Sequence, residues 1–175
     1  MTQKYFTGTF LAPWSPFLFW ISWGVSVGFL VAIFFSWSKG GTDAWLITVI
    51  LLLTLLITAL FTVKGYQLQG QALLIQRLFW QTKIDLRKLQ SARVEPQAFR
   101  KSIKTCGNGG LFSFSGYYWS KSLGKFKCYV TDMKRSVILE IDSKKIVISP
   151  DSPEGFVRAL GFKNQVNRPY SSNQL

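Results

Sequence analysis

The stretch AWLITVILLLTLLITALFTV, residues 44–63, decides how the rest of this chain is organised. It contains no charged residue, no proline and no glycine over its whole length. A helix of that length covers about 30 Å at about 1.5 Å per residue, which matches the hydrocarbon core of a bilayer. A buried helix of a soluble protein would carry a polar stripe, whereas the polar residues here are threonines alone. The stretch therefore predicts a membrane-spanning helix.

A second apolar stretch, FLFWISWGVSVGFLVAIFFSW at residues 17–37, precedes it and is also uncharged. Pro16 occupies a position that favours the first turn of a helix. A signal peptide is the alternative, but this run is longer than a signal core, lacks an Ala-x-Ala cleavage pattern and is followed by another span. Residues 38–43 are too short a connection for anything but an antiparallel hairpin. We therefore expect a two-helix transmembrane hairpin with spans at 17–37 and 44–63.

The flanking residues indicate how such a hairpin would lie. Tryptophans near the span ends match the aromatic belts of membrane interfaces, namely Trp14, Trp20, Trp37 and Trp45. Lys39 alone lies on the side of the connection, against four basic residues on the other side, Lys4, Lys64, Arg77 and Lys83. The positive-inside rule then predicts that both termini are cytoplasmic. Residues 1–16 are expected to form an N-terminal cytoplasmic segment.

Small and hydroxyl residues along the two spans suggest packing faces. Gly24 and Gly28 form a GxxxG pattern, and Thr54, Thr58 and Thr62 repeat every four residues. In one interpretation these faces pack on each other within the hairpin. In the other, the GxxxG face docks another membrane protein or a second copy of the chain.

Charge is concentrated in the rest of the chain. The formal net charge is +13, and residues 1–63 contain only two lysines and one aspartate, so residues 64–175 carry about +12 of it. Their length suits one compact domain. Such a basic domain is attracted to lipid headgroups, nucleic acid or an acidic protein, although a merely well-solvated surface explains the charge equally well.

From Lys64 onward the apolar period becomes that of strands and ends in that of a helix. Short alternating stretches lie at residues 66–69, 73–79, 83–86, 91–94, 125–130, 137–142 and 145–148. Ser152 and Pro153 then open a short amphipathic helix that Gly161 ends. We expect about seven antiparallel strands and one C-terminal helix, followed by a disordered tail at residues 163–175.

Four motifs resemble the bacterial pleckstrin-homology (PH) domain family of small membrane proteins. They are GNGGLFSFSGYY at 107–118, LGKF at 123–126, VTD at 130–132 and VISPDSPEGF at 147–156. The resemblance extends over residues 65–162, and it implies that the expected hairpin lies in a bacterial inner or other internal membrane. It implies a PH-like domain, with two packed antiparallel sheets and a helix that closes one corner, and it implies little about activity.

No pattern of catalytic or metal-binding residues is present in the sequence. The chain has no histidine, and its two cysteines, Cys106 and Cys128, do not make a zinc site or an expected disulfide. Cys128 falls on the apolar face of its strand, whereas Cys106 follows a polar stretch and is a candidate reactive thiol. The glycines between 107 and 116 match neither a Walker loop nor a dinucleotide fingerprint, and they predict a tight turn followed by packed aromatic residues. We expect no enzyme activity, no cofactor and no metal.

Candidate site residues are therefore surface residues. The partner or lipid surface is predicted at a basic and aromatic set, namely Arg100, Lys101, Lys104, Tyr117, Tyr118, Trp119, Lys121, Lys125, Lys127, Lys134 and Arg135. The favoured hypothesis is a membrane-anchored, non-enzymatic interaction module, an assembly factor or accessory subunit that holds a membrane-protein partner at the cytoplasmic face. The alternative is binding of anionic lipid headgroups through the basic patches. A nucleic-acid binder or an enzyme is the least supported class, because the lysines are too scattered to form a stripe.

Overall fold

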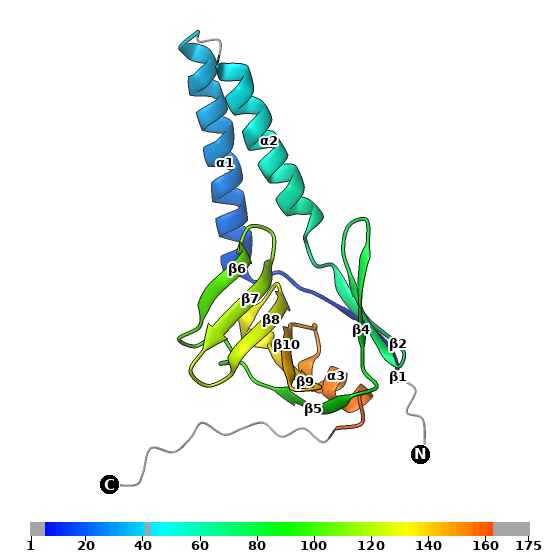
Figure 1. Ribbon diagram of the computed structural model, residues 1–175. Helices are drawn as coiled ribbons and strands as arrows, with labels where there is room; N and C mark the ends of the chain where they lie inside the picture. The colour runs from blue at the N-terminus through cyan, green and yellow to red at the C-terminus, as the bar shows by residue number, and fades with distance from the viewer. Residues whose placement is uncertain (1–5, 41–42, 163–175) are drawn as a thin grey trace, which may run out of the picture.

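The computed structural model describes residues 6–40 and 43–162, in which two apolar helices rise from a two-sheet β-domain (Figure 1). Helix α1 (Pro16–Ser38) and helix α2 (Ala44–Leu60) run antiparallel and diverge toward the domain. Ser15 caps α1, since its hydroxyl accepts a hydrogen bond from the Leu18 amide at 3.1 Å. Near the tip, Trp37 Nε1 donates to Thr48 Oγ1 at 3.0 Å and joins the helices.

The two helices differ in length. α1 is long and apolar enough to cross a membrane, whereas α2, at 17 residues, is a shorter apolar helix. The expectation that the second helix continues to Val63 is wrong. The Phe61 and Thr62 amides donate to Thr58 and Ala59 in a tightened last turn, and Val63 is fully buried in the core of the β-domain.

A four-stranded antiparallel sheet follows the order β1 (Phe6–Leu11), β2 (Gly65–Gly70), β3 (Ala72–Gln76) and β4 (Gln81–Asp85). Strand β1 comes from the segment at 1–16 that we expected to lie outside the domain. It pairs with β2 along its whole length, from Phe6 opposite Gly70 to Leu11 opposite Gly65. The helices are therefore inserted between two neighbouring strands of one sheet. Residues 1–5 and the tail at 163–175 lie outside the described residues.

The second sheet has six strands, and its edges are β5 and β6. In spatial order they are β5 (Leu89–Val94), β9 (Val137–Ile141), β10 (Lys144–Ile148), β8 (Gly124–Val130), β7 (Phe114–Ser120) and β6 (Ile103–Gly109). Strands β8 and β10 pair in parallel, so the expectation of purely antiparallel sheets is wrong. Both neighbours of β9 are taken, because it pairs with β5 on one side and with β10 on the other. Strand β8 can therefore join the sheet only at the free side of β10, next to which it runs in the same direction. The described residues form ten strands rather than about seven.

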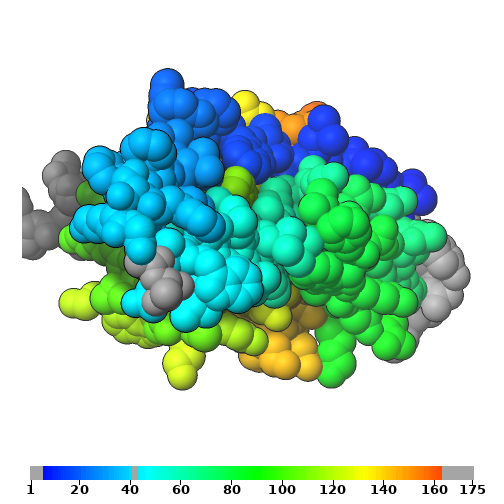
Figure 2. Space-filling model, turned by 90° about the horizontal axis from the view of Figure 1, so that it is seen from above, coloured from blue at the N-terminus to red at the C-terminus, as the bar shows by residue number. Residues whose placement is uncertain are grey.

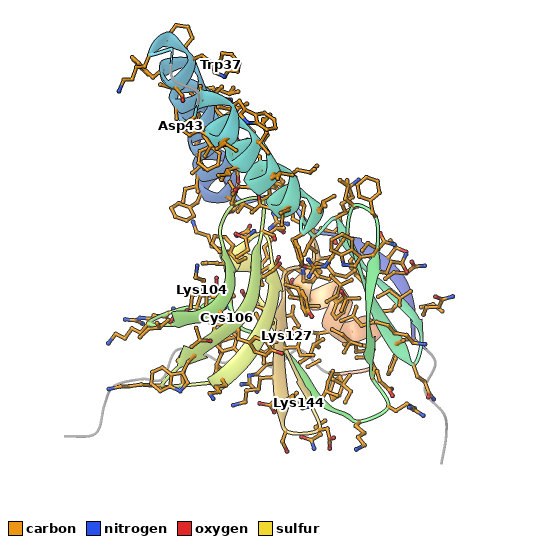
Figure 3. The ribbon with its side chains drawn as sticks, turned by 45° about the horizontal axis from the view of Figure 1, so that its top comes forward. Trp37, Asp43, Lys104, Cys106, Lys127 and Lys144 are labelled. Carbon is orange, nitrogen blue, oxygen red and sulfur yellow. The ribbon has the colours of Figure 1, made fainter. Side chains whose placement is uncertain are left out.

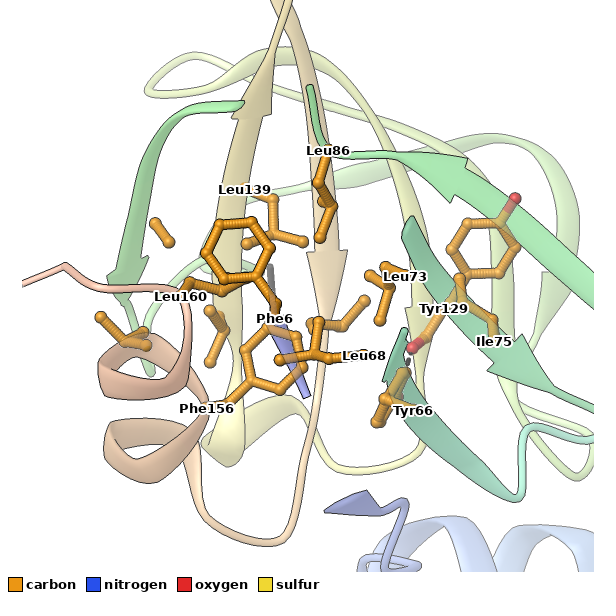
Figure 4. Packing of buried hydrophobic residues seen from close by; sticks show 14 of the residues in the cluster. Phe6, Tyr66, Leu68, Leu73, Ile75, Leu86, Tyr129, Leu139, Phe156 and Leu160 are labelled. Carbon is orange, nitrogen blue, oxygen red and sulfur yellow. Dashed lines mark hydrogen bonds between the residues drawn. The ribbon is translucent and has the colours of Figure 1, made fainter. Parts of the chain in front are cut away.

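The main core lies between the sheets and under helix α3 (Pro153–Ala159), as Figure 4 shows. Phe156 of α3 packs edge-on against Phe10 of β1, with 5.0 Å between the ring centroids. Gly161 ends the helix as expected, with φ at 73° and the Phe162 amide donating to Val157. The predicted arrangement of two packed sheets with a C-terminal helix is confirmed.

Tyr66 joins the two sheets inside this core. Its hydroxyl donates to the Tyr129 carbonyl at 2.6 Å and accepts from the Ser149 amide at 3.1 Å. The side chain is fully buried, and this burial raises the pKa of its phenol.

A second cluster covers the other face of the six-stranded sheet. It contains Tyr118, Phe126 and Cys128 from β7 and β8, with Ala98 from the segment after β5. Leu18 of α1 is fully buried in the same cluster. Strands β9 and β10 are thus buried on both faces, whereas the outer strands β6 and β7 leave one face exposed, and the first turn of α1 is part of the domain.

Candidate functional site

The base of α1 is held by hydrogen bonds from two loops of the six-stranded sheet. The Ser15 amide donates to the Thr131 carbonyl at 3.2 Å, and Thr131 Oγ1 donates to the Pro13 carbonyl at 2.9 Å. About two turns further along, Ser22 Oγ accepts from the Phe112 amide at 2.9 Å. Ser22 is buried as a result. The first two turns of α1 are therefore fixed to the domain.

The end of α2 is held at one carbonyl oxygen. Phe61 O accepts from Arg77 Nη1 at 2.9 Å and from Ser113 Oγ at 3.2 Å. Arg77 comes from the β3–β4 turn and Ser113 from the β6–β7 turn, so both sheets hold the helix end. A cation is favourable there, because the carboxyl end of a helix carries partial negative charge.

Arg77 is surrounded by aromatic rings. Its guanidinium carbon lies 5.2 Å from the Phe61 ring, 5.4 Å from the Tyr129 ring and 5.8 Å from the Trp80 ring. Burial lowers the pKa of Arg77 and outweighs the opposing influence of Tyr129 and Tyr66. The guanidinium of Arg77, which binds the carbonyl at the end of α2, therefore lies among aromatic rings on the domain side of the helix.

The strand registers place four of the basic residues at the end of the domain away from the helices. Ile103, Trp119 and Lys125 align across β6, β7 and β8 at that end. Gly109, Phe114 and Val130 align at the helix end. The basic residues of the far end, here called the distal basic end, are Lys101, Lys121, Lys125 and Lys144. Figure 3 shows Lys144 at the opposite end of the molecule from Trp37 and Asp43.

The distal basic end has excess positive charge. Nearby ion pairs use the local carboxylates: Arg87 with Asp85 at 2.6 Å, Lys88 with Asp142 at 3.0 Å and Lys145 with Glu140 at 3.9 Å. Within residues 6–40 and 43–162, no acidic side chain lies within ion-pair distance of the four lysines of the distal basic end. This end can attract an anionic surface.

Lys144 was not among the predicted site residues, and three residues that were do not join the distal basic end. Arg100 donates to Gln97 Oε1 at 3.3 Å. The Lys104 side chain runs along β6 toward Gly109. Lys127 Nζ lies 5.5 Å from the Tyr117 ring and 5.3 Å from the Tyr129 ring, and its pKa is raised, mainly by a hydrogen bond to Tyr129.

Lys134 and Arg135 lie near the helices instead. They belong to a 3₁₀ turn (Met133–Arg135) directly after the Thr131 contact with the base of α1. Arg135 is engaged, since Nη1 donates to the Asp151 carbonyl at 2.8 Å and Nε lies 3.5 Å from Asp132. The predicted basic surface is therefore divided between two ends of the domain.

The aromatic residues of β7 alternate between the two faces of the sheet. Tyr117 and Trp119 are 52% and 38% exposed and remain available to a partner. Tyr118 is buried and stacks on Phe126, with 5.9 Å between centroids. Its assignment to a partner surface is wrong, because the second cluster covers that face of the strand.

The predicted packing residues of the helices do not pack within the hairpin. Gly24 and Gly28 face open space, with no atom within 4 Å of an added Cβ. Thr54 and Thr58 donate to carbonyls of their own helix, at Ile50 and Thr54, and Thr62 lies beyond the last residue of α2. The interpretation of mutual packing is wrong, and docking on the open glycine face stays a prediction.

Sequence analysis misses an exposed apolar turn between β3 and β4. Leu78, Phe79 and Trp80 are 41%, 77% and 38% exposed, and Trp80 packs edge-on against Phe61 with 5.2 Å between centroids. The predicted strand at residues 73–79 includes part of this turn, whereas β3 ends at Gln76. The available signal was a run of three uncharged bulky residues directly after Arg77.

The two cysteines differ in burial, and two of the glycines allow close approach of neighbouring strands. Cys128 is fully buried and its burial raises the pKa of the thiol, whereas Cys106 is exposed. Gly107 and Gly116 face each other across β6 and β7 with φ at 116° and 138°, and a Cβ on either would collide with the opposite backbone. In the part of the chain that the structure describes, no group of three or more cysteine, aspartate and glutamate residues could hold a metal.

Comparison with known proteins gives one match. A family model described as "Bacterial PH domain" matches residues 64–164, which is more than half of the chain. No curated protein and no solved structure matches. The match includes β2 to α3 and leaves out β1 and both helices.

Proposed function

This chain belongs to the bacterial PH domain family, and on that premise we propose that it is a membrane-anchored, non-enzymatic module that holds a protein partner at the cytoplasmic face of a bacterial membrane. PH domains are generally interaction modules that bind proteins or lipids. In this proposal α1 and α2 form the transmembrane hairpin, both termini are cytoplasmic, and the protein acts as an assembly factor or accessory subunit.

One observation carries the proposal, namely that the apolar helices are inserted between β1 and β2. The chain enters α1 directly from β1 and returns from α2 into β2, and hydrogen bonds fix both helix bases to the domain. A flexible tether would let the domain search a large volume. This double attachment instead holds the domain in one orientation relative to the helices, which suits a partner in or beside the same membrane.

The charge distribution favours a protein partner over the lipids of that membrane. In an anchored chain the distal basic end points away from the bilayer surface, and electrostatic attraction to headgroups falls within about 8 Å at physiological salt. The distal basic end is better placed to meet an acidic surface of a partner. The exposed rings of Tyr117 and Trp119 lie on β7, the strand that pairs with β8 and its Lys125.

Cross-linking in membranes followed by native purification of the full chain tests the proposal. We expect a protein to be recovered in a fixed ratio to the chain. The triple variant K121E/K125E/K144E should lower that recovery, and K134E, which alters a lysine near the helices, is the matched control. Recovery of the chain alone, or equal effects of both variants, would count against this function.

Binding of anionic lipid is the second candidate, and the position of Lys134 and Arg135 beside the base of α1 favours it. If lipid binding is the function, K134E becomes the test variant and K121E/K125E/K144E the control in a vesicle assay. K134E would weaken association with anionic lipid, and the triple distal variant would leave it unchanged.

A further inference from the structure

The β3–β4 turn is an apolar projection with no role in the core of the domain. Arg77 N–H donates to the Trp80 carbonyl at 3.0 Å and closes the turn, which leaves Leu78 and Phe79 at its tip. Phe79, at 77% exposed, is the most exposed of the large apolar side chains that the structure describes. Three consecutive exposed bulky residues on a closed turn are costly in water, and they mark a contact surface.

The position of this turn identifies what it contacts. Trp80 lies against Phe61, directly after the last residue of α2, so the turn is continuous with the apolar surface of the helix. Figure 2, viewed from the helix end, shows the β3–β4 hairpin beside α2 on the surface that faces the viewer. The turn and the helix therefore present one apolar surface in the same direction.

The length of α2 supplies an independent argument. Its 17 residues extend about 25 Å, whereas the hydrocarbon core of a bilayer is about 30 Å thick. The helix is short of that thickness by about one turn, and its domain end is the end that Phe61 and the β3–β4 turn adjoin. Phe61, Leu78, Phe79 and Trp80 provide apolar and aromatic surface at that missing turn, and aromatic rings are the side chains preferred at membrane interfaces.

The charges near the turn are arranged consistently with this position. Arg77 is the cation within the turn, and its guanidinium folds back onto Phe61 O and the Tyr129 ring rather than toward the tip. The tip is therefore uncharged, and the cation lies on the domain side of it, where the side chain of an interfacial arginine is directed.

We propose that the β3–β4 turn, residues 78–80, inserts into the interfacial layer of the bilayer beside the end of α2, as a third membrane contact that fixes the tilt of the PH domain. This inference rests on the proposed membrane anchoring by α1 and α2. The turn contacts the lipids directly, at the depth of the headgroups and first carbons of the acyl chains.

Depth-dependent quenching of a fluorophore in vesicles tests this insertion with the full chain. In a C106S background, single cysteines replace Phe79 at the tip, Ile50 in the middle of α2 and Lys121 at the distal basic end. All three positions are exposed, so labelling does not disturb the core. Each labelled variant is reconstituted in phosphatidylcholine vesicles that carry a nitroxide either near the headgroup or near the end of the acyl chain.

We expect the label at position 79 to lose fluorescence with the shallow nitroxide more than with the deep one. The label at position 50 should lose more with the deep nitroxide, and the label at position 121 should lose fluorescence with neither. If position 50 is quenched and position 79 behaves as position 121 does, insertion of the turn is overturned while the anchor stands. If position 50 is not quenched either, the anchor itself fails, and insertion of the turn fails with it.

Discussion

Replacing Arg77 with methionine should loosen the attachment of α2 to the domain. Methionine keeps most of the apolar stem and removes the guanidinium that donates to Phe61 O. The lost charged hydrogen bond contributes about 1.5–3 kcal/mol, and the three ring contacts contribute about 0.5 kcal/mol each. Against this stands the desolvation of a buried guanidinium whose Nε has no hydrogen-bond partner, at about 1–3 kcal/mol.

The balance is a net destabilisation of about 2 kcal/mol. For a chain of this size it corresponds to a fall in Tm of about 4–8 °C, which circular dichroism can follow in mild detergent. Arg87→Met removes an arginine from an exposed ion pair with Asp85 and is the matched control, with no resolvable change expected.

A double-mutant cycle separates the attachment from general loss of packing. Ser113→Ala alone leaves Arg77 on the Phe61 carbonyl, and Arg77→Met alone leaves Ser113, whereas the double variant removes both donors. The combined loss should exceed the sum of the single losses by about 1 kcal/mol or more. An additive cycle, or an Arg77→Met variant as stable as Arg87→Met, would refute the role of this carbonyl.

Three further predictions concern the β-domain. Because burial raises the pKa of Tyr66, the folded state retains the phenol proton above pH about 10 while the unfolded state loses it, so stability should fall as pH rises beyond that point. Tyr66→Phe should flatten this pH dependence in alkaline denaturation curves, and an unchanged slope would contradict the prediction. A thiol reagent should modify Cys106 in the native protein and reach Cys128 only after unfolding, as mass spectrometry of the labelled chain would record; native modification of Cys128 would contradict its burial. Gly116→Ala should lower stability by about 1–3 kcal/mol, because φ is 138° and the added Cβ meets Gly107 Cα at 2.8 Å; Gly24→Ala, in open space, is the control, and equal Tm values would be inconsistent with the close approach.

Local periodicity predicted the elements that depend on local patterns. The alternation in residues 125–130 gave β8, and Pro153 with Gly161 gave the limits of α3. Strand β1 was missed because FTGTFL is short and becomes a strand only by pairing with β2, which is distant in sequence. Strands β6 and β7 were missed because their glycines interrupt the apolar alternation where the two backbones approach closely.

The positions of the surface residues depend on pairing between strands that are distant in sequence, and local sequence patterns do not reveal that pairing. The parallel pairing of β8 with β10 depends on β9 lying beside β5, which no local pattern records. The same registers place Lys121 and Lys125 far from the helices, although in sequence they are indistinguishable from Lys134. Sequence analysis assigns Tyr118 to the surface with its two neighbours, because three consecutive aromatic residues do not record which of them faces the second cluster.

Labelling from the two sides of a membrane tests most directly whether the helix pair spans the bilayer with the PH domain on one side. In the C106S background, Lys39→Cys marks the hairpin tip and Lys121→Cys marks the domain. In sealed inverted vesicles, an impermeant maleimide should modify position 121 at once and position 39 only after the membrane is permeabilised. Modification of both positions before permeabilisation would contradict a spanning hairpin.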